Sequence, residues 1–261
     1  MRTIALLSDF GLSDNYVAGM KGVILSLVPQ VNMVDITHQV PRHDIRRGAF
    51  LLASSFAYFP RLTIFLAVVD PGVGSRRKAI ALKTRNYYFV GPDNGLLSVA
   101  AVGDGVKKIV TLENKKYFSG DHVCRTFHGR DIFAPAAARI AKDEAFDSFG
   151  RVLRKFKRVN FGSPRVVRGV LTAEIIYEDK FGNLVTNISP KRFYGFTGGR
   201  RFVAWLNGKK IIHVSPSYAQ SRRGVPFFVE GGFGFMEVSL REESALEYFS
   251  FKPGNKLIIE I

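Results

Sequence analysis

The chain of 261 residues is poor in the features that mark several protein classes. It has a single cysteine, Cys124, so it cannot form an internal disulfide, and this favours a reducing compartment. The apolar run before Ser8 and Asp9 is too short for the core of a signal peptide. No apolar run reaches the roughly 18 residues that a membrane span needs. We therefore expect a cytoplasmic protein that binds no membrane.

Metal-binding and dinucleotide-binding signatures are also missing. The histidines show no HExxH or similar spacing; they are His38, His43, His122, His128 and His213. His38 and His43 flank a loop with Asp44, which leaves a metal-dependent hydrolase as a weak alternative. Gly72 and Gly74 form a GxG turn without the third glycine of a nicotinamide fingerprint. We expect no metal and no cofactor.

Positive charge, in contrast, is abundant. Lysine and arginine number 38 against 22 acidic residues, which gives a net charge of +16. Such a balance fits nucleic-acid binding, an anionic membrane surface or a solvated basic face. The densest run, Arg151 to Arg158, is short, and the other basic pairs are scattered. A solvated face is favoured, and a basic nucleotide-binding or nucleic-acid-binding protein without catalysis is the alternative.

The hydrophobic pattern predicts two domains. Up to about residue 150, short apolar runs alternate with helical patterns, which indicates βαβ units around a mostly parallel sheet flanked by helices. One such helix is predicted over 14–28, with Ser13 as its N-cap and Pro29 as its end. Residues 151–168 are predicted as a linker. Residues 169–261 read as short strands, with an Asn207-Gly208 hairpin turn, and predict a smaller all-β, barrel-like domain.

Acidic residues follow two of the predicted strands. Asp9 ends the first strand, and Asp70 ends the run "LTIFLAVVD". In open α/β sheets ligands bind beyond the carboxyl ends of the strands, and an acid there can accept both hydroxyls of a ribose. The alternatives are a turn cap for Asp9 and a structural ion pair with a nearby arginine for Asp70.

Two segments of the second half combine polar and aromatic side chains. The stretch "YEDKFGNLVTNI" carries Asp179, Phe181 and Asn183, and "SPSYAQ" adds Tyr218. Turn chemistry alone explains the acid, the glycine and the asparagine. The same groups could hold a base and a ribose, with Tyr218 stacking on the base.

Taken in order, these segments resemble the S-adenosylmethionine (SAM) hydroxide adenosyltransferases, also described as SAM hydrolases, which share a superfamily with the fluorinase and chlorinase. The resemblance runs through nearly the whole chain. It is carried by "LLSDFGLSDNYVAGMKGV", "VDITHQVPRHDIRRGAFLL", "VVDPGVGSRRKAI", "GPDNGLL", "TFHGRDIFAPAAA", "DKFGNLVTNI" and "GFGFMEVSL".

The resemblance implies attack of water or hydroxide at C5′ of SAM, which gives adenosine and methionine. It places the catalytic set on Asp70, Arg77 and His128. Asp70 would orient the water, Arg77 would stabilise hydroxide character, and His128 would fix the cluster or move a proton. Arg76 and Ser75 receive no role.

The resemblance also implies the substrate contacts. Asp9 would hold the ribose, Asp14, Asn15 and Tyr16 the methionine, and the backbone of the segment from Phe235 to Glu242 the adenine. The full predicted set is Asp9, Asp14, Asn15, Tyr16, Gly129, Asp179, Phe181, Asn183, Tyr218, Phe235, Glu237, Leu240 and Glu242. The stretch "SLREES" departs from the Asn- and Gly-rich turn of relatives.

Finally, the resemblance implies a homotrimer with its sites between subunits, and a preference of some relatives for the R epimer at sulfur. His43 stands where the halogenases have an aromatic residue, which favours the hydrolase. A SAM-dependent halogenase is the lesser alternative, because Asp70 would repel a halide.

Overall fold

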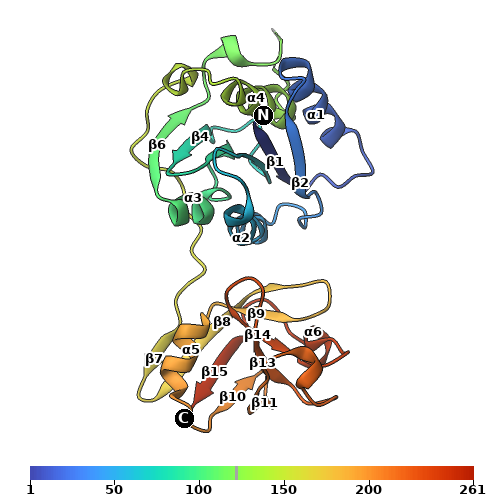
Figure 1. Ribbon diagram of the computed structural model, residues 1–261, viewed down its shortest axis with the longest axis vertical. Helices are drawn as coiled ribbons and strands as arrows, with labels where there is room; N and C mark the ends of the chain where they lie inside the picture. Colours follow the sequence, from blue (N-terminus) through green and yellow to red (C-terminus); the bar gives the residue numbers. More distant parts are fainter. Residues whose placement is uncertain (121–122) are drawn as a thin grey trace. The chain divides into compact units, whose positions relative to one another are not determined.

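A computed structural model describes residues 1–120 and 123–261 of the chain. His122 therefore lies outside the described residues. The described part divides into two compact units, Met1–Asn160 and Phe161–Ile261 (Figure 1). The predicted boundaries at 150 and 168, and the assignment of the nucleophile site to the first domain and adenine contacts to the second, stay predictions.

Unit 1 is built on a six-stranded sheet. Its strands are β1 (Thr3–Ser8), β2 (Asn32–Thr37), β3 (Ile64–Val68), β4 (Ala79–Thr84), β5 (Tyr88–Pro92) and β6 (Val106–Thr111). They are ordered β2-β1-β3-β5-β4-β6. Only β4 runs against its neighbours, so the sheet is mixed but mostly parallel, as predicted.

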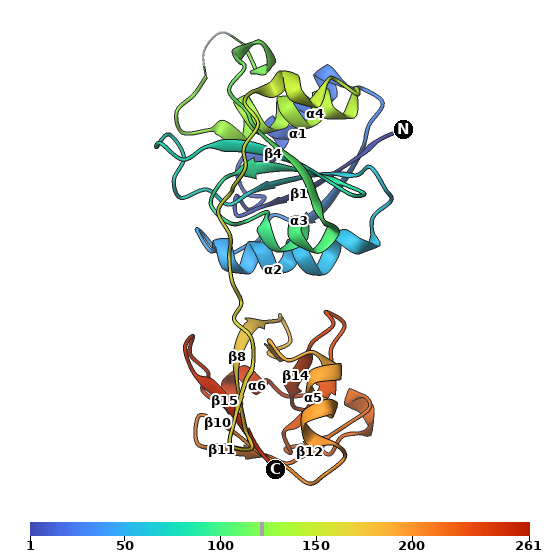
Figure 2. The ribbon, with the colours of Figure 1, turned by 90° about the vertical axis from the view of Figure 1, so that its left-hand side faces the viewer.

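Helices cover both faces of this sheet (Figure 2). They are α1 (Tyr16–Leu27), α2 (Ile45–Ser55), α3 (Ser98–Asp104) and α4 (Ala134–Ala141), with 3-10 turns at Phe56–Tyr58, Lys115–Tyr117 and Phe146–Phe149. A π-helical turn, Gly129–Phe133, leads into α4. Alternate residues of β1 serve the two layers, because side chains of a strand point to opposite faces. Ile4 and Leu6 pack with α1 and α4, whereas Ala5 and Leu7 pack with α2 and α3.

The start of α1 differs from the prediction. The helix begins at Tyr16 after Asn15, whose side chain makes no capping hydrogen bond, and Ser13 lies outside the helix. The correction has a simple cause: the backbone oxygen of Asn15 accepts the amide of Gly19 at 2.8 Å, so the first turn starts two residues after Ser13. Asp14, Asn15 and Tyr16 are thereby left exposed at the helix entrance.

Unit 2 is a barrel-like sheet, which confirms the predicted class. Its strands are β7 (Arg165–Val167), β8 (Val170–Glu178), β9 (Leu184–Thr186), β10 (Val203–Leu206), β11 (Lys209–Ile211), β12 (His213–Val214), β13 (Phe227–Glu230), β14 (Met236–Ser239) and β15 (Lys256–Glu260). They follow the order β11-β10-β15-β8-β9-β14-β13-β12, and β7 pairs with β8. Asn207 and Gly208 both have positive φ, 50° and 77°, and join β10 to β11 as the predicted hairpin.

Two helices of unit 2 were not predicted, α5 (Pro190–Thr197) and α6 (Ala245–Tyr248); a 3-10 turn covers Tyr218–Gln220. α5 begins with local signals: Ser189 accepts the amide of Arg192 and Pro190 occupies the first turn. Its buried Phe193 packs on Phe202 and Phe228 in the core of the unit. The helix is therefore held by aromatic packing as well as by its cap.

The basic run from Arg151 to Arg158 lies on unit 1. Lys157 donates its amide to Asp93 at 2.7 Å, and the next contact is the amide of Val159 with Ser98 Oγ at 3.0 Å. Leu153 and Phe156 are half-buried against the unit, whereas Arg154, Lys155, Lys157 and Arg158 are exposed. The cations thus point to solvent from a segment whose apolar residues anchor it.

Candidate active site

Asp9 and Asp70 lie at the same edge of the unit 1 sheet. Strands β1 and β3 are parallel neighbours, and Ser8 is paired with Val68 in their register. Each acid follows its strand by one or two residues, so both loops leave the carboxyl edge. The predicted position of both acids at strand ends is confirmed. Open α/β sheets bind ligands at this edge, and ligand binding here stays a prediction.

A tight turn returns the chain from Asp70 to Arg77. The amide of Val73 donates to the Asp70 carbonyl at 3.2 Å. Ser75 Oγ donates to the Gly72 carbonyl at 2.7 Å and accepts the Arg77 amide at 3.2 Å. Ser75 therefore shapes the turn, a role that sequence reasoning did not assign, while Arg76 is exposed.

Gly74 allows this turn to approach a second segment closely. Its φ is +75°, in the region that glycine adopts without steric cost. A Cβ atom at this position would lie 2.6 Å from the backbone oxygen of Arg125. Gly74 thus brings the Asp70 turn against the segment that leads to His128.

Asp70 and Arg77 form a buried ion pair. Arg77 Nε donates to both carboxylate oxygens at 2.9 Å, and Nη2 also donates to Oδ2. The side chains are only 5% and 6% exposed. The guanidinium also stacks over Phe133, with Cζ 5.2 Å from the ring centre. Because the pair is bidentate and desolvated, its geometry is fixed far better than that of a surface ion pair.

His128 completes the cluster, and its contact with Arg77 sets its protonation. Arg77 Nη2 lies 2.7 Å from His128 Nδ1. A guanidinium only donates, so Nδ1 accepts and the ring proton resides on Nε2. Burial, followed by the charge of Arg77, lowers the pKa of His128 from its ordinary 6.5. His128 is therefore neutral, with an Nε2–H group free to donate.

An aromatic cluster, missed by the sequence reasoning, lies beside His128. The rings of Phe10, Tyr16 and Phe127 lie 5.1 to 5.8 Å apart. Gly129 is buried under them, because a Cβ there would lie 3.2 Å from Phe127 and 3.4 Å from Phe10. The loop after β1, the start of α1 and the His128 segment therefore meet in one place. Phe10 was detectable only as an aromatic residue next to Asp9.

Asp9 is held by one hydrogen bond from the backbone, as far as the described residues show. Its Oδ2 accepts the amide of His43 at 2.9 Å, and His43 has a positive φ of 65°. Asp44 is the N-cap of α2, where it accepts the Arg47 amide at 2.8 Å. Asp9 keeps its other oxygen for further hydrogen bonds, and Asp44 has a structural task.

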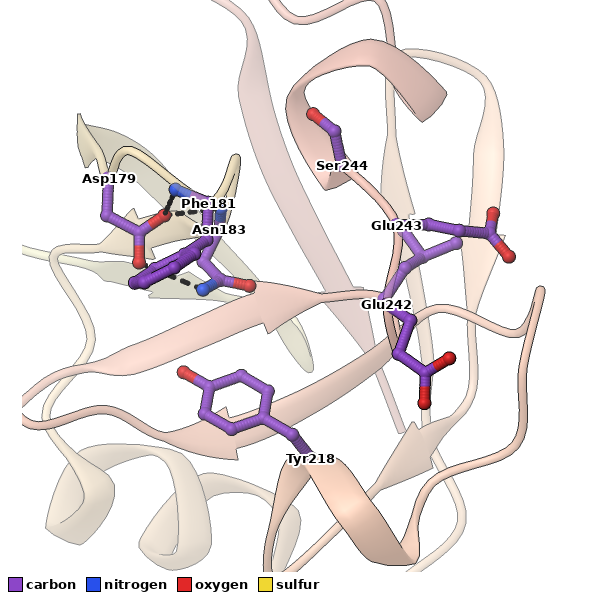
Figure 3. A pocket seen from close by; sticks show the side chains of 8 residues that line it. Asp179, Phe181, Asn183, Tyr218, Glu242, Glu243 and Ser244 are labelled. Carbon is purple, nitrogen blue, oxygen red and sulfur yellow. Dashed lines mark hydrogen bonds between the residues drawn. The ribbon is translucent and has the colours of Figure 1, made fainter.

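Unit 2 carries an open pocket of about 620 Å³ (Figure 3). Six of its eight lining residues come from the predicted set, namely Asp179, Phe181, Asn183, Tyr218, Leu240 and Glu242. The other two are Glu243 and Ser244. Sequence reasoning missed Glu243 and Ser244, although both directly follow Glu242. The lining contains three carboxylates and no lysine or arginine. Two of these carboxylates, Asp179 and Glu243, belong to no ion pair found in the described part of the chain, whereas Glu242 pairs with two arginines.

One wall of this pocket is a hydrogen-bonded turn. Asp179 Oδ1 accepts the amides of Phe181 and Asn183 at 2.9 and 2.8 Å, and Oδ2 accepts Asn183 Nδ2 at 2.9 Å (Figure 3). Gly182 packs against Ser244 so closely that any side chain would collide with it. The turn is therefore fixed to the opposite wall, and Phe181 is left 67% exposed in the pocket.

Tyr218 and Glu237 form a second fixed element. The Tyr218 hydroxyl donates to Glu237 Oε2 at 2.8 Å, and Glu237 is only 2% exposed. Burial raises the pKa of Glu237, and burial followed by this hydrogen bond raises the pKa of Tyr218. Glu237 does not line the pocket; it holds the Tyr218 ring that does.

The remaining predicted residues lie around β14. Phe235 is half-buried just before the strand, and Leu240 is buried just after it. Glu242 has a positive φ of 59° and pairs with Arg223 and Arg241. The structure thus brings Asp70, Arg77 and His128 together in unit 1, and places six of the eight predicted unit 2 residues around one pocket, all but Phe235 and Glu237.

Within residues 1–120 and 123–261 no group of three or more His, Cys, Asp or Glu side chains is arranged to hold a metal ion. In the same part of the chain no helix has the length and apolar character needed to cross a membrane.

Two sequence profiles cover most of the chain. The SAM hydroxide adenosyltransferase N-terminal domain matches residues 4–150, and the C-terminal domain of the same family matches residues 173–258. The chain belongs to the SAM hydroxide adenosyltransferase family. The resemblance predicted from the motifs is thereby confirmed.

Members of this family from distant organisms are similar to the chain. A protein from Thermus thermophilus named (R)-S-adenosyl-L-methionine hydrolase is 34% identical over 97% of this chain and 98% of its own length. One of the same name from Salinispora tropica is 44% identical over 69% of this chain and 70% of its own. A crystal structure of an uncharacterized conserved protein from Thermotoga maritima superposes with a TM-score of 0.92 at 32% identity, covering all of both chains. Fluorinases match at lower identity, from 24% to 29%.

Proposed function

We propose that this SAM hydroxide adenosyltransferase hydrolyses SAM at C5′ to adenosine and methionine, without a cofactor. The observation that carries the proposal is the buried Asp70, Arg77 and His128 cluster at the ligand-binding edge of the sheet. The names of the relatives support the same activity and favour the R epimer at sulfur.

The reaction needs alignment more than acid catalysis. A water oxygen forms the bond to C5′, the C5′–S bond breaks, and its electron pair returns to sulfur. Methionine therefore leaves as a neutral thioether and needs no proton, while one proton from water is released. The protein has to hold a desolvated water in line with the C5′–S bond, and most of the rate gain then comes from positioning.

The cluster assigns a part to each of its side chains. The free Nε2–H of His128 donates to the water oxygen and helps to stabilise hydroxide character, together with the charge of Arg77. His128 is not the base, because its only lone pair is already occupied by Arg77. Asp70 keeps lone pairs on both carboxylate oxygens, so it orients the water and receives the proton. Proton transfer to Asp70 occurs late, as the bond to C5′ forms and the attacking oxygen becomes more acidic.

Substrate contacts are proposed for both units. Asp9 holds the ribose hydroxyls, and Asp14, Asn15 and Tyr16 at the entrance of α1 hold the methionine end. The unit 2 pocket receives the adenine, with Phe181 and Tyr218 as its aromatic walls. We also propose the homotrimer of relatives, in which unit 1 of one subunit and unit 2 of its neighbour enclose the ligand. A cytoplasmic location stays a prediction that rests on the single cysteine.

Local carboxylates oppose the net charge of +16. SAM is cationic at sulfur and gains nothing from a positive protein. The pocket in unit 2, however, is lined by Asp179, Glu242 and Glu243 without a lysine or arginine. Glu242 is paired with Arg223 and Arg241, so Asp179 and Glu243 are the carboxylates that oppose the positive field there. The more distant exposed cations act less, because salt screens charges beyond roughly 10 Å.

The direct test incubates pure protein with each sulfonium epimer and follows adenosine and methionine by chromatography. Both products in equal amounts are expected, faster from the R epimer. If neither epimer gives adenosine, the proposal is overturned. Steeply salt-dependent binding to RNA or duplex DNA would then favour the non-catalytic alternative, since phosphate contacts release counterions. Chloride- or fluoride-dependent formation of a halogenated nucleoside would favour the halogenase.

Activity is expected to fall as the pH drops below the ordinary pKa of histidine, 6.5. A second proton on His128 would occupy Nδ1 and set two cations against each other, which disrupts the cluster. Stability should change with pH in the same direction. The pKa of His128 is lower in the folded state than in the unfolded state, so its contribution to stability is complete above pH 6.5. That contribution is lost as the pH falls through the folded-state pKa. Rates and thermal unfolding between about pH 5 and 8 measure both effects.

The matched variant for this pH dependence is His128→Asn. Asparagine offers an acceptor to Arg77 and a donor to water but does not titrate in this range. We expect a slower enzyme with a flatter acid limb. An acid limb of the same steepness in this variant would assign the titration to another group.

A further inference from the structure

A chain of polar side chains lies behind the loop that carries Asp9. Ser8 Oγ is 2.7 Å from His38 Nδ1, and His38 Nε2 is 3.1 Å from Asp35 Oδ1. Lys21 Nζ donates to the other oxygen of Asp35 at 2.6 Å. This row of polar side chains therefore runs from the surface of α1, through β2, to the end of β1.

The negative charge of Asp35 determines which atom donates and which accepts in each of these contacts. The anionic Asp35 faces Nε2, so the ring proton is held on Nε2. Nε2 makes no hydrogen bond, so its 3.1 Å contact with Asp35 is an electrostatic attraction. Nδ1 is then a lone pair, and the Ser8 hydroxyl donates its only proton to it. Burial lowers the pKa of His38, in keeping with a neutral ring, although Asp35 acts in the opposite direction.

An acid, an imidazole and a hydroxyl in this order resemble the chain that activates a nucleophilic serine. Burial excludes that role here. Ser8 is 0% exposed and forms the last residue of a central strand, so no substrate can reach its oxygen. We therefore expect the row of Asp35, His38 and Ser8 to act on the structure of the protein and not on a substrate.

The contacts of Ser8 and His38 converge on the two residues that follow Asp9, which are Phe10 and Gly11. With its proton given to His38, Ser8 Oγ accepts the amide of Phe10 at 3.3 Å. The backbone oxygen of His38 accepts the amide of Gly11 at 2.7 Å. His38 thus holds the loop through its side chain and through its backbone, while the His43 amide holds the Asp9 carboxylate.

We propose that His38 is a positioning residue, which acts through Ser8 to place the Asp9 carboxylate for the ribose. This inference rests on the proposed function, since it takes Asp9 as the ribose-binding acid. Without the imidazole, the buried Ser8 hydroxyl loses its acceptor and must turn toward another, and the Phe10 amide loses its fixed partner. The loop then loses preorganisation, so substrate binding suffers more than the chemical step.

The test compares KM and kcat for SAM in His38→Phe, which keeps a ring of similar size but removes both nitrogens. We expect KM to rise about tenfold with kcat changed less than about threefold. His213→Phe, an exposed histidine of unit 2, is the matched control and should leave both unchanged. If His38→Phe unfolds, Ser8→Ala makes the same test with a smaller change, and Ser8→Thr, which retains the hydroxyl, should restore a low KM.

A double-variant cycle separates positioning from a general loss of packing. On an Asp9→Ala background, His38→Phe should raise KM less than about twofold, because the group it positions is gone. A tenfold effect on both backgrounds, or an unchanged KM in His38→Phe and Ser8→Ala, would overturn the inference while wild-type turnover upholds the proposed function. A wild-type protein that forms no adenosine would overturn both.

Discussion

Replacing Asp70 with asparagine is expected to lower the rate of adenosine formation about 10³-fold at saturating SAM. Asparagine keeps the shape of the side chain but carries no negative charge and accepts no proton from water. The substitution also leaves Arg77 charged in a site where its side chain is 6% exposed. Unfolding free energy should therefore fall as well, by about 3 kcal/mol. Chromatographic rates and thermal unfolding measure the two losses.

A double variant separates these two losses. Asp70→Asn combined with Arg77→Gln removes both charges, so no uncompensated cation remains and much of the stability should return. Activity should stay low, because neither the base nor the fixed positive charge is restored. Asp147→Asn is the matched control, since this aspartate is 61% exposed and pairs with Lys108 at the surface. Full activity in Asp70→Asn would remove the carboxylate from the mechanism.

Gly74→Ala is expected to lower kcat about 10²-fold, although Gly74 touches no substrate. Its Cβ would lie 2.6 Å from the Arg125 backbone oxygen, so the Asp70 turn and the His128 segment must move apart. The hydrogen bond between Arg77 Nη2 and His128 Nδ1 is 2.7 Å long and would be stretched or broken by such a shift. Misplacement of the water by about an ångström is enough for a loss of this size.

Gly105→Ala provides the matched control for Gly74→Ala. Gly105 has a similar φ of +80° in the same unit, but the nearest neighbouring atom to its Cβ would be the end of the Arg85 side chain at 3.8 Å. Both variants should lose about 1 kcal/mol of stability from backbone strain. Only Gly74→Ala should lose activity, and equal kinetics of the two variants would contradict the close-approach argument.

Sequence patterns predicted unit 1 better than unit 2. Strands such as Ile64–Val68 are continuous apolar runs, because helices cover both faces of the sheet, and such runs are easy to find. The short helix Pro190–Thr197 was missed because its eight residues give little periodicity and its place depends on the buried Phe193. The Ser13 cap was misassigned because several polar residues precede α1, and only the backbone decides which of them starts the turn.

The candidate site likewise contains some residues that the sequence could predict and some contacts that it could not. Asp70 was predictable as an acid at the end of a strand, and Asp179 and Asn183 as polar groups of a turn. The pairing of Tyr218 with Glu237 was not, because the two residues are 19 positions apart and meet only in the folded unit. Glu237 was predicted as a contact to the substrate and instead holds the Tyr218 ring. The triad-like arrangement behind Asp9 was also hidden, since a lone histidine such as His38 is more often structural, and nothing local connects it with Ser8.

The sequence alone determined which chemical groups the chain offers: the order of its motifs indicated the family, and the strand ends indicated where a ligand is expected to bind. Tertiary structure decided what each group can do. His128 stands 51 residues from Arg77 in the chain, and their contact makes the imidazole a donor and excludes it as the base. The burial of Ser8 likewise turns a triad-like sequence of groups into a support for a loop. Periodicity reports only local geometry, whereas protonation and accessibility depend on which distant segments pack together.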